Sequence, residues 1–366
     1  MSGVNRFLRS DISRMGAYTP IESVEELGRS YGIPPENLVK LDGNENPYGC
    51  SPTVKQALAS YQYYHIYPDP EQRALRRLVS KYANADWDSI VLGAGSDELI
   101  DLVLRLTIEP GYKVINCPPT FGMYPFCTEV CGGKVVEVKR DKDFNIQLDN
   151  VKSAIDSDTR VIFITSPNNP TANLTQEEVI LDLLKSGIVV VVDEAYYEFS
   201  GVTVVPLVSR YDNLVVLRSF SKWAGLAGLR VGYGIMSPEL VRYIIKIKQP
   251  YNINVAAQVA VRQSLIDLDY MKGTIRRIIE ERERLLVKLA ELKFLKPYPS
   301  RSNFILCSVA GGRARELHEG LRHKGIFIRY FDTPLLKNCL RVSVGKPEHT
   351  DALIGALKEL WEGRHG

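Results

Sequence analysis

Short runs of aliphatic and β-branched residues alternate with segments of helical length through the first two thirds of the chain, and this alternation constrains the fold most strongly. We expect strands at 90–92, 113–117, 134–138, 161–165, 188–192, 214–217 and 230–234. Several of these runs are apolar at successive positions, as in strands that helices cover on both faces. The pattern predicts an α/β fold with a mostly parallel, seven-stranded sheet flanked by helices.

Two helices of this first part have clear start signals. Ser51 and Asp69 are good N-cap residues, and each is followed by a proline, at Pro52 and Pro70. Proline is favoured at the first helical position because its missing N–H would have no helical partner there. We therefore predict that helices begin directly after Ser51 and Asp69.

The pattern changes beyond residue 250. A long charged helix is expected at 276–292, strands at 303–307, 326–330 and 340–344, and a final helix at 348–362. These elements predict a smaller α+β domain packed on the first. We divide the chain into an N-terminal arm (1–45) that contributes to the small domain, a large domain (46–250) and the small domain (251–366).

Composition narrows the class of protein. The 366 residues include 46 Lys and Arg against 43 Asp and Glu, a formal charge of only +3, which gives no sign of nucleic acid as a partner. No run approaches the roughly 20 apolar residues of a membrane helix. The N-terminus lacks the apolar core of a secretory signal, so we expect a cytoplasmic location, or a plastid if a transit peptide has been removed.

The six cysteines lack the paired spacing of a zinc site, and we expect reduced thiols and no metal.

The segment 219–222, Ser-Phe-Ser-Lys, follows an expected strand and has three interpretations. The order S-x-x-K occurs in serine acyl-enzymes, but their K-T-G segment is absent. A solvated lysine at a strand end is the plainest interpretation. The third is a lysine that forms a Schiff base with a bound aldehyde, with Ser219, Ser221 and Arg230 available for a phosphate.

The segment 192–196, Val-Asp-Glu-Ala-Tyr, ends the most apolar strand. Ligands of α/β sheets bind beyond the carboxyl ends of the strands, which places Asp193 at the rim of such a site. A helix N-cap is the ordinary role of this aspartate. The alternative is an anionic partner for a protonated pyridine nitrogen, with Asn169 and Tyr196 able to donate to a phenolate oxygen.

The segment 93–98, Gly-Ala-Gly-Ser-Asp-Glu, begins like a dinucleotide fingerprint, but Glu98 stands at the third glycine position. This departure argues against a nicotinamide dehydrogenase. A glycine turn that opens a helix still presents free N–H groups to a phosphate. Ser96 as an ordinary N-cap is the alternative.

Two arginines, Arg329 and Arg341, stand on expected strands of the small domain. Arginine on a strand is usually a surface residue or half of an ion pair. Two of them beside one site favour capture of an anion, because the guanidinium group matches carboxylate and phosphate geometry.

Seven motifs occur together and in order, and with them the chain resembles the histidinol-phosphate aminotransferases, a family within the aspartate-aminotransferase superfamily of pyridoxal-phosphate (PLP) enzymes. They are Asn-Glu-Asn-Pro-Tyr at 44–48, Tyr-Pro-Asp-Pro at 67–70, Ser-Pro-Asn-Asn-Pro-Thr at 166–171, Asp-Glu-Ala-Tyr at 193–196, Ser-Phe-Ser-Lys at 219–222, Gly-Leu-Arg-Val-Gly at 228–232 and Leu-Arg-Val-Ser-Val-Gly at 340–345. The resemblance runs from about Tyr18 to the C-terminal helix. It implies a fold-type-I PLP enzyme.

The resemblance implies a role for each site residue. Lys222 would carry PLP as a Schiff base and move protons, and Asp193 and Tyr196 would complete the catalytic set. Asn169 would join Tyr196 at the phenolate oxygen. The phosphate would be bound by Gly95, Ser96, Asp97, Ser219, Ser221 and Arg230.

Further residues are implied around this centre. Phe121 would stack on the cofactor ring, where the family often has tyrosine, and Tyr67 would reach the cofactor of the other subunit in a homodimer. Arg341 would bind the carboxylate of glutamate and the phosphate of histidinol phosphate in turn. The remaining substrate-binding candidates are Arg329, Tyr18 and Asn44. Ala172 stands where the family usually has glycine.

The implied activity is transamination between L-histidinol phosphate and 2-oxoglutarate, in ping-pong half-reactions of histidine biosynthesis. An aromatic aminotransferase or a threonine-phosphate decarboxylase of the same fold would also keep Lys222 and Asp193. A regulator that binds PLP as a ligand is a rival from another class, but no helix-turn-helix has room before Tyr18. A structural relative without catalytic activity is a further alternative, but the presence of Lys222 argues against it.

Overall fold

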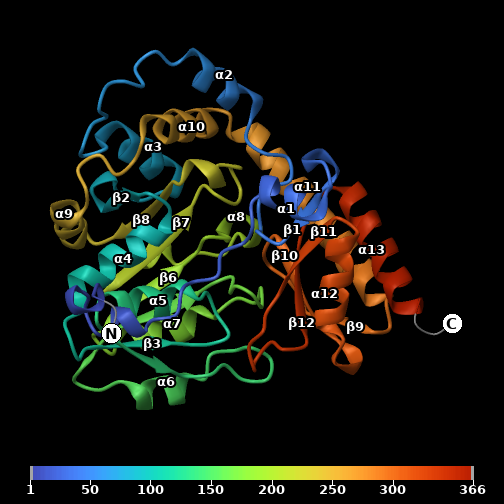
Figure 1. Ribbon diagram of the computed structural model, residues 1–366. Helices are drawn as coiled ribbons and strands as arrows, with labels where there is room; N and C mark the ends of the chain where they lie inside the picture. The colour runs from blue at the N-terminus through green and yellow to red at the C-terminus, as the bar shows by residue number, and fades with distance from the viewer. Residues whose placement is uncertain (1–2, 364–366) are drawn as a thin grey trace.

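A computed structural model describes residues 3–363 and shows two sheets, one in each half of the molecule (Figure 1). The larger sheet has seven strands in the order β2-β8-β7-β6-β5-β3-β4. Its strands are β2 (Ile90–Gly93), β3 (Lys113–Asn116), β4 (Lys134–Glu137), β5 (Thr159–Thr165), β6 (Val189–Asp193), β7 (Leu214–Ser219) and β8 (Gly232–Met236). In the described structure β8 runs opposite to the other six strands and is antiparallel to both of its neighbours, β2 and β7. The predicted mostly parallel, seven-stranded α/β sheet is confirmed.

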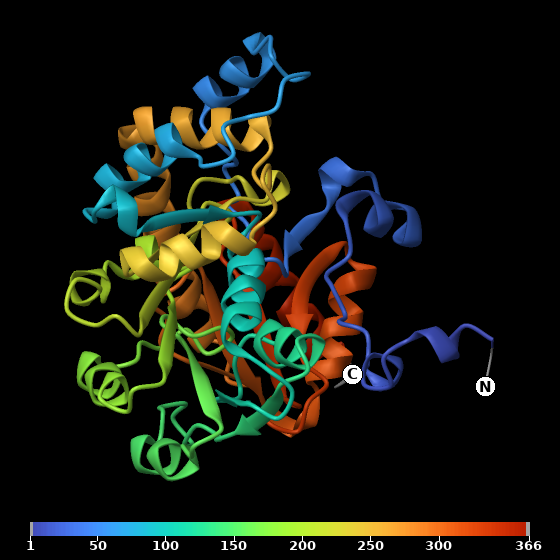
Figure 2. The same cartoon turned by 90° about the vertical axis from the view of Figure 1, so that its left-hand side faces the viewer.

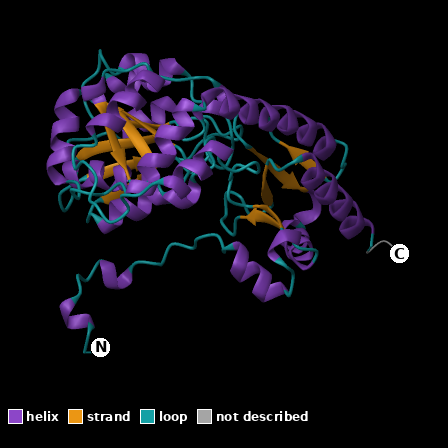
Figure 3. Ribbon diagram, turned by 90° about the horizontal axis from the view of Figure 1, so that it is seen from above, coloured by secondary structure: helices purple, strands orange, loops and turns teal. Residues whose placement is uncertain are grey.

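Helices cover both faces of this sheet (Figure 3). Successive side chains of β6 alternate between two apolar cores: Val190 and Val192 pack in one, and Val191 in the other. The layers are built from α2 (Pro52–Ser60), α3 (Arg73–Ala83), α4 (Ser96–Thr107), α5 (Met123–Val130), α6 (Leu148–Ala154), α7 (Glu177–Leu184), α8 (Tyr197–Ser200), α9 (Pro238–Ile247) and α10 (Val255–Ile266). Burial on both faces explains the unbroken apolar runs in the sequence.

The smaller sheet has five strands in the order β1-β11-β12-β10-β9. They are β1 (Val39–Leu41), β9 (Leu295–Pro297), β10 (Phe304–Val309), β11 (Ile326–Tyr330) and β12 (Cys339–Ser343). The 23-residue helix α11 (Leu268–Ala290) leads from the large body to this sheet, which α12 (Ala314–His323) and α13 (Pro347–Glu362) accompany. Because β1 pairs in parallel with β11, the N-terminal part of the chain belongs to the small sheet.

The first 45 residues contain more regular structure than their sequence pattern indicates. Helix α1 (Val24–Tyr31) begins after Ser23, whose side chain accepts the N–H of Glu26, and β1 follows. Before α1 the arm has two short 3-10 turns, Asn5–Phe7 and Ile12–Arg14, at the outside of the body (Figure 2), and an irregular segment that reaches the cavity described below. It contacts α5 through Arg9, which donates to the Val130 carbonyl at 3.1 Å.

One of the two predicted N-caps is wrong. Ser51 caps α2, but α3 begins at Arg73 after Gln72, which has a left-handed φ of 56°. Asp69 instead accepts the N–H of Arg73 at 2.9 Å and pairs with its guanidinium. The Pro70 turn therefore precedes the helix rather than opening it.

Strand β8 begins two residues later than expected because Arg230 has a left-handed φ of 51° at the end of a short 3-10 helix.

Within residues 3–363, no helix is both long and apolar enough to cross a membrane. All six cysteines are free thiols.

Candidate active site

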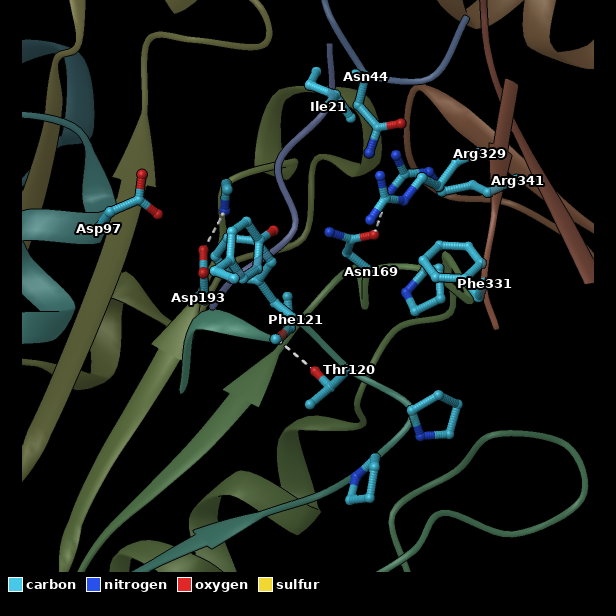
Figure 4. A pocket seen from close by; sticks show the side chains of 18 of the residues that line it. Ile21, Asn44, Asp97, Thr120, Phe121, Asn169, Asp193, Arg329, Phe331 and Arg341 are labelled. Atoms are coloured by element: carbon cyan, nitrogen blue, oxygen red, sulfur yellow. Dashed lines mark hydrogen bonds between the residues drawn. The ribbon is translucent and has the colours of Figure 1, made fainter. Parts of the chain in front are cut away.

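A cavity of about 980 Å³ lies between the carboxyl ends of the large sheet and the small sheet, and Figure 4 shows part of its lining. It collects all the predicted site residues except Gly95 and Tyr67. These lining residues are Tyr18, Asn44, Ser96, Asp97, Phe121, Asn169, Asp193, Tyr196, Ser219, Ser221, Lys222, Arg230, Arg329 and Arg341. Residues far apart in the sequence thus line one cavity, which is the arrangement expected for a cofactor site.

Lys222 lies in the turn after β7, and its Nζ donates to the Gly43 carbonyl at 3.0 Å. Burial, and then the positive charge of Arg341, lower the pKa of the amine to about 8. A solvated lysine at a strand end would keep its ordinary value, near 10.4. About half of the amine is therefore neutral and nucleophilic at pH 8.

This shift predicts a pH dependence for capture of the cofactor. The neutral amine is the reactive form, so the rate at which the apoprotein covalently binds added PLP should rise with pH and reach half its maximum near pH 8. Stopped-flow absorption at constant ionic strength measures this rate. A midpoint near pH 10 would show an ordinary lysine and contradict the account.

Asp193 is the last residue of β6 and is 3% exposed. Its Oδ1 accepts the N–H of Ala195 at 3.0 Å, and its Oδ2 accepts the hydroxyl of Tyr124 at 2.7 Å. It does not cap a helix, because α8 begins at Tyr197 after the cap residue Tyr196. Burial raises the pKa of this carboxyl to about 6.

Among residues 3–363, no Lys, Arg or His forms an ion pair with Asp193. A buried carboxylate without a cation is unfavourable, and a protonated ring nitrogen entering the cavity would compensate it.

Tyr196 connects the large sheet to the small one. Its hydroxyl accepts a hydrogen bond from Nδ2 of Asn44 at 3.0 Å. The hydroxyl of Ser343 on β12 donates to Oδ1 of Asn44 at 2.9 Å. Burial raises the pKa of Tyr196 to about 12, so the phenol stays neutral and can donate to a ligand. Asn44 therefore positions Tyr196 in addition to lining the cavity.

The two arginines are neighbours on adjacent strands, where Arg329 of β11 is paired with Arg341 of β12 (Figure 4). Nη1 of Arg341 donates to Oδ1 of Asn169 at 2.6 Å, while its Nε has no partner in the described structure. Burial lowers the pKa of Arg341 to about 10. A buried guanidinium with an unused donor and no carboxylate partner favours binding of an anion.

The opposite end of the cavity fits a phosphate. Helix α4 begins at Ser96 after Gly95, whose φ of 81° favours glycine, so Ser96 is not the cap residue. A Cβ on Gly95 would lie 2.5 Å from Nη2 of Arg230. This end is lined by the first N–H groups of α4, the hydroxyls of Ser219 and Ser221, and the guanidinium of Arg230. Arg230 also pairs with Asp97 at 2.6 Å.

The amine, the uncompensated carboxylate and the phosphate end together fit PLP, which carries an aldehyde, a ring nitrogen and a phosphate. The ring of Phe121 also lines the cavity, and its edge-to-face contact with Tyr124, 5.6 Å between centroids, fixes its place. Ala172 has a left-handed backbone with φ 61°, a conformation that glycine adopts more readily than alanine.

Tyr67 is not in the cavity of its own chain. It is 77% exposed and stacks on Tyr251, with ring centroids 4.4 Å apart.

Three groups of the site were not predicted from the sequence: Tyr124, Ser343 and the Gly43 carbonyl. Ser343 lies within a motif already singled out, so its position was a signal. Tyr124 follows Phe121 by three residues, but nothing in the sequence separates it from an ordinary core tyrosine. The role of the Gly43 carbonyl could not be predicted, because every residue has a backbone carbonyl.

The family model of class I and II aminotransferases matches residues 36–357. A histidinol-phosphate aminotransferase of Dehalococcoides mccartyi is 49% identical over 359 residues, covering 98% of this chain and 99% of that protein. Chloroplastic histidinol-phosphate aminotransferase 1 of Arabidopsis thaliana is 45% identical over 358 residues, covering 97% of this chain and 86% of that protein.

Among solved structures, the histidinol-phosphate aminotransferase of Sinorhizobium meliloti in complex with pyridoxal-5'-phosphate superimposes with a TM-score of 0.89, at 25% identity and 98% coverage of both chains. The fold, the extent of these matches and the site agree: the chain belongs to the class I and II aminotransferases and, within them, to the histidinol-phosphate aminotransferase family.

Proposed function

We propose that this PLP-dependent aminotransferase moves the amino group of L-histidinol phosphate to 2-oxoglutarate, giving imidazole-acetol phosphate and L-glutamate in histidine biosynthesis. The observation that carries the proposal is Arg341, a buried guanidinium that lines the same cavity as Lys222 and whose Nε has no partner among residues 3–363. One such group can bind a phosphate ester and a carboxylate in successive half-reactions, because the two anions present similar oxygen pairs.

Bound PLP supplies an aldehyde for the amino group and a ring that withdraws electrons from the substrate Cα. We assign the ring nitrogen to Asp193, the phenolate oxygen to Tyr196 and Asn169, and ring stacking to Phe121. The phosphate is assigned to the N-terminus of α4 (Gly95, Ser96, Asp97), Ser219, Ser221 and Arg230. Arg341 takes the substrate anion, with Arg329, Tyr18 and Asn44 beside it.

Lys222 moves the proton. Its Nζ is neutral above about pH 8, so it can take a proton from the Cα of the bound amino donor and later release it. The Gly43 carbonyl, 3.0 Å from Nζ, holds the amine in place by accepting one of its hydrogens. Tyr196 and Asn169 stay as neutral donors throughout.

Substrate kinetics test the proposal. We expect the wild-type protein to use L-histidinol phosphate in preference to phenylalanine and to transaminate, not decarboxylate, threonine phosphate if it accepts it. We expect Arg341→Lys to lower kcat/KM by about tenfold to 100-fold for both histidinol phosphate and glutamate, because lysine keeps the charge but loses the planar donor pair. Arg329→Lys is the matched control, with a smaller loss.

Two outcomes would contradict this assignment. A preference for phenylalanine would favour an aromatic aminotransferase of the same fold. A loss in Arg341→Lys that is confined to one of the two substrates would show that the arginine is not shared.

We propose that the protein works as a homodimer in which Tyr67 completes the cofactor site of the other subunit. The support is an exposed group of apolar side chains around this tyrosine: Tyr63 (58%), Tyr64 (49%), Ile66 (52%), Tyr67 (77%) and Tyr251 (46%). Such a surface on one chain indicates an interface.

Mixed dimers test this arrangement. Lys222→Ala and Tyr67→Ala homodimers should both be weakly active. In hybrids of the two, one site would carry both changes and the other neither, so random mixing should recover about a quarter of the wild-type activity. Hybrids that form, as native mass spectrometry shows, without any gain in activity would contradict a shared site.

We further propose the domain division at residues 45 and 250, because each of the two sheets has its own helices; α10 begins after residue 250 but packs on α2 and α3 of the large body. A cytoplasmic location, or a plastid where a transit peptide precedes the chain, fits an enzyme of biosynthesis.

A further inference from the structure

We infer that Tyr124 is a positioning residue for the cofactor: its hydroxyl fixes Asp193 in the place and charge state that a protonated ring nitrogen requires. This inference rests on the assignment of Asp193 to the ring nitrogen. Tyr124 lies on α5, is fully buried and lines no part of the cavity described above. It therefore acts through Asp193 and does not contact the substrate.

The hydrogen bonds around Tyr124 have a fixed direction. Its hydroxyl lies 2.7 Å from Oδ2 of Asp193 and 2.7 Å from Oγ1 of Thr165. An ionised carboxylate only accepts, so the single hydrogen of Tyr124 points to Asp193, and Thr165 must donate to Tyr124. Thr165 and Asp193 are paired residues on β5 and β6, so the two strand ends hold both partners of the tyrosine.

The ring of Tyr124 is held independently of its hydroxyl. It stacks on Phe163 with centroids 4.6 Å apart and an interplanar angle of 5°, and it meets the edge of Phe121. Tyr124 therefore contacts two residues assigned to the cofactor ring, Phe121 through its ring and Asp193 through its hydroxyl. Removing the oxygen alone leaves the packing of the ring in place.

The hydroxyl also favours the ionised form of Asp193. Burial raises the pKa of this carboxyl to about 6, and the Tyr124 hydrogen bond is the largest influence that opposes the rise. Without that bond, Asp193 would keep only the Ala195 N–H, which lies on its other oxygen. A smaller fraction of Asp193 would then be ionised at neutral pH, and its carboxylate would be free to rotate.

A comparison of two cofactors separates this role from a merely structural one. The probes are PLP and its carbocyclic analogue, in which a C–H replaces the ring nitrogen. The ratio of their dissociation constants from the apoprotein reports the interaction of Asp193 with the nitrogen. In Tyr124→Phe we expect the preference for PLP to fall about tenfold, since hydrogen bonds to charged groups contribute at this level.

Tyr82→Phe is the matched control, because Tyr82 also donates to a half-buried carboxylate, Glu198, at 2.9 Å, but outside the cavity. Its preference for PLP should equal that of the wild type. Thr165→Val keeps the Tyr124 hydroxyl but removes its donor, and we expect a smaller fall of about threefold. This variant also tests the inference if Tyr124→Phe fails to fold.

If Tyr124→Phe bound both cofactors more weakly by the same factor, the ratio of their dissociation constants would be unchanged. That result would show a structural role and overturn the inference. A wild-type protein that does not distinguish the two cofactors would overturn the assignment of Asp193 itself, and the inference with it.

Discussion

Replacing Lys222 with alanine should lower the rate of transamination by at least about 10³-fold, because the same amine binds the cofactor and carries the proton. The folded structure should change little, since Nζ makes one hydrogen bond, to the Gly43 carbonyl. The visible absorption band of lysine-bound PLP should disappear as well. Steady-state kinetics and a spectrum of the dialysed protein measure both effects.

Two controls separate the charge of Lys222 from its proton chemistry. Lys222→Arg keeps a positive charge but cannot give up its proton near neutral pH, so it should be as inactive as Lys222→Ala. Added methylamine should restore part of the proton transfer in the alanine variant and not in the arginine variant. A Lys222→Ala protein that transaminates at the native rate would refute the mechanism.

Replacing Asp193 with asparagine should lower kcat by about 10² to 10³-fold with a smaller change in KM, because the charge that compensates a protonated ring nitrogen is lost. The apoprotein should respond in the opposite way and become more stable. The folded pKa of Asp193, about 6, lies above its ordinary value of 3.8, so its contribution to stability is present below pH 4 and is lost as the pH rises through 6.

At pH 8 the Asp193→Asn apoprotein should therefore be more stable than the wild type, by about 3 kcal/mol in the free energy of unfolding. The gain should vanish below pH 4, where the aspartate is neutral. Urea unfolding of both apoproteins across this range measures the difference.

The neighbouring Glu194 provides a control with the opposite expected effect. It is paired with Arg218 at 2.9 Å, so Glu194→Gln should lower the free energy of unfolding. Equal stability of wild type and Asp193→Asn at pH 8 would show that the carboxylate is compensated within the apoprotein.

The sequence predicts those parts of the site that follow from strand ends. Asp193 and Ser219 end β6 and β7, which run parallel, and their positions follow from the rule that parallel strands present their carboxyl ends at one edge. The apolar runs that identify these strands are local, so the strands could be predicted to within two residues.

Contacts between distant segments could not be predicted in this way. Asn44 meets Tyr196 because β1 joins the small sheet beside β11, and no local pattern encodes that pairing. Helix α1 was missed because it has only eight residues, and its buried residues are Leu27 and Gly28. Asp69 satisfies the rules for an N-cap, yet its side chain binds Arg73 and the helix starts later. Local propensity is a weak guide where tertiary contacts decide.

The most direct test of the account is the visible spectrum of the PLP-loaded protein before and after addition of L-histidinol phosphate alone. The band of lysine-bound PLP should fall while the band of the amino form of the cofactor grows, and 2-oxoglutarate should reverse the change. A lysine-bound band that histidinol phosphate leaves unaltered would contradict the proposed substrate, and a protein without such a band would contradict the role of Lys222.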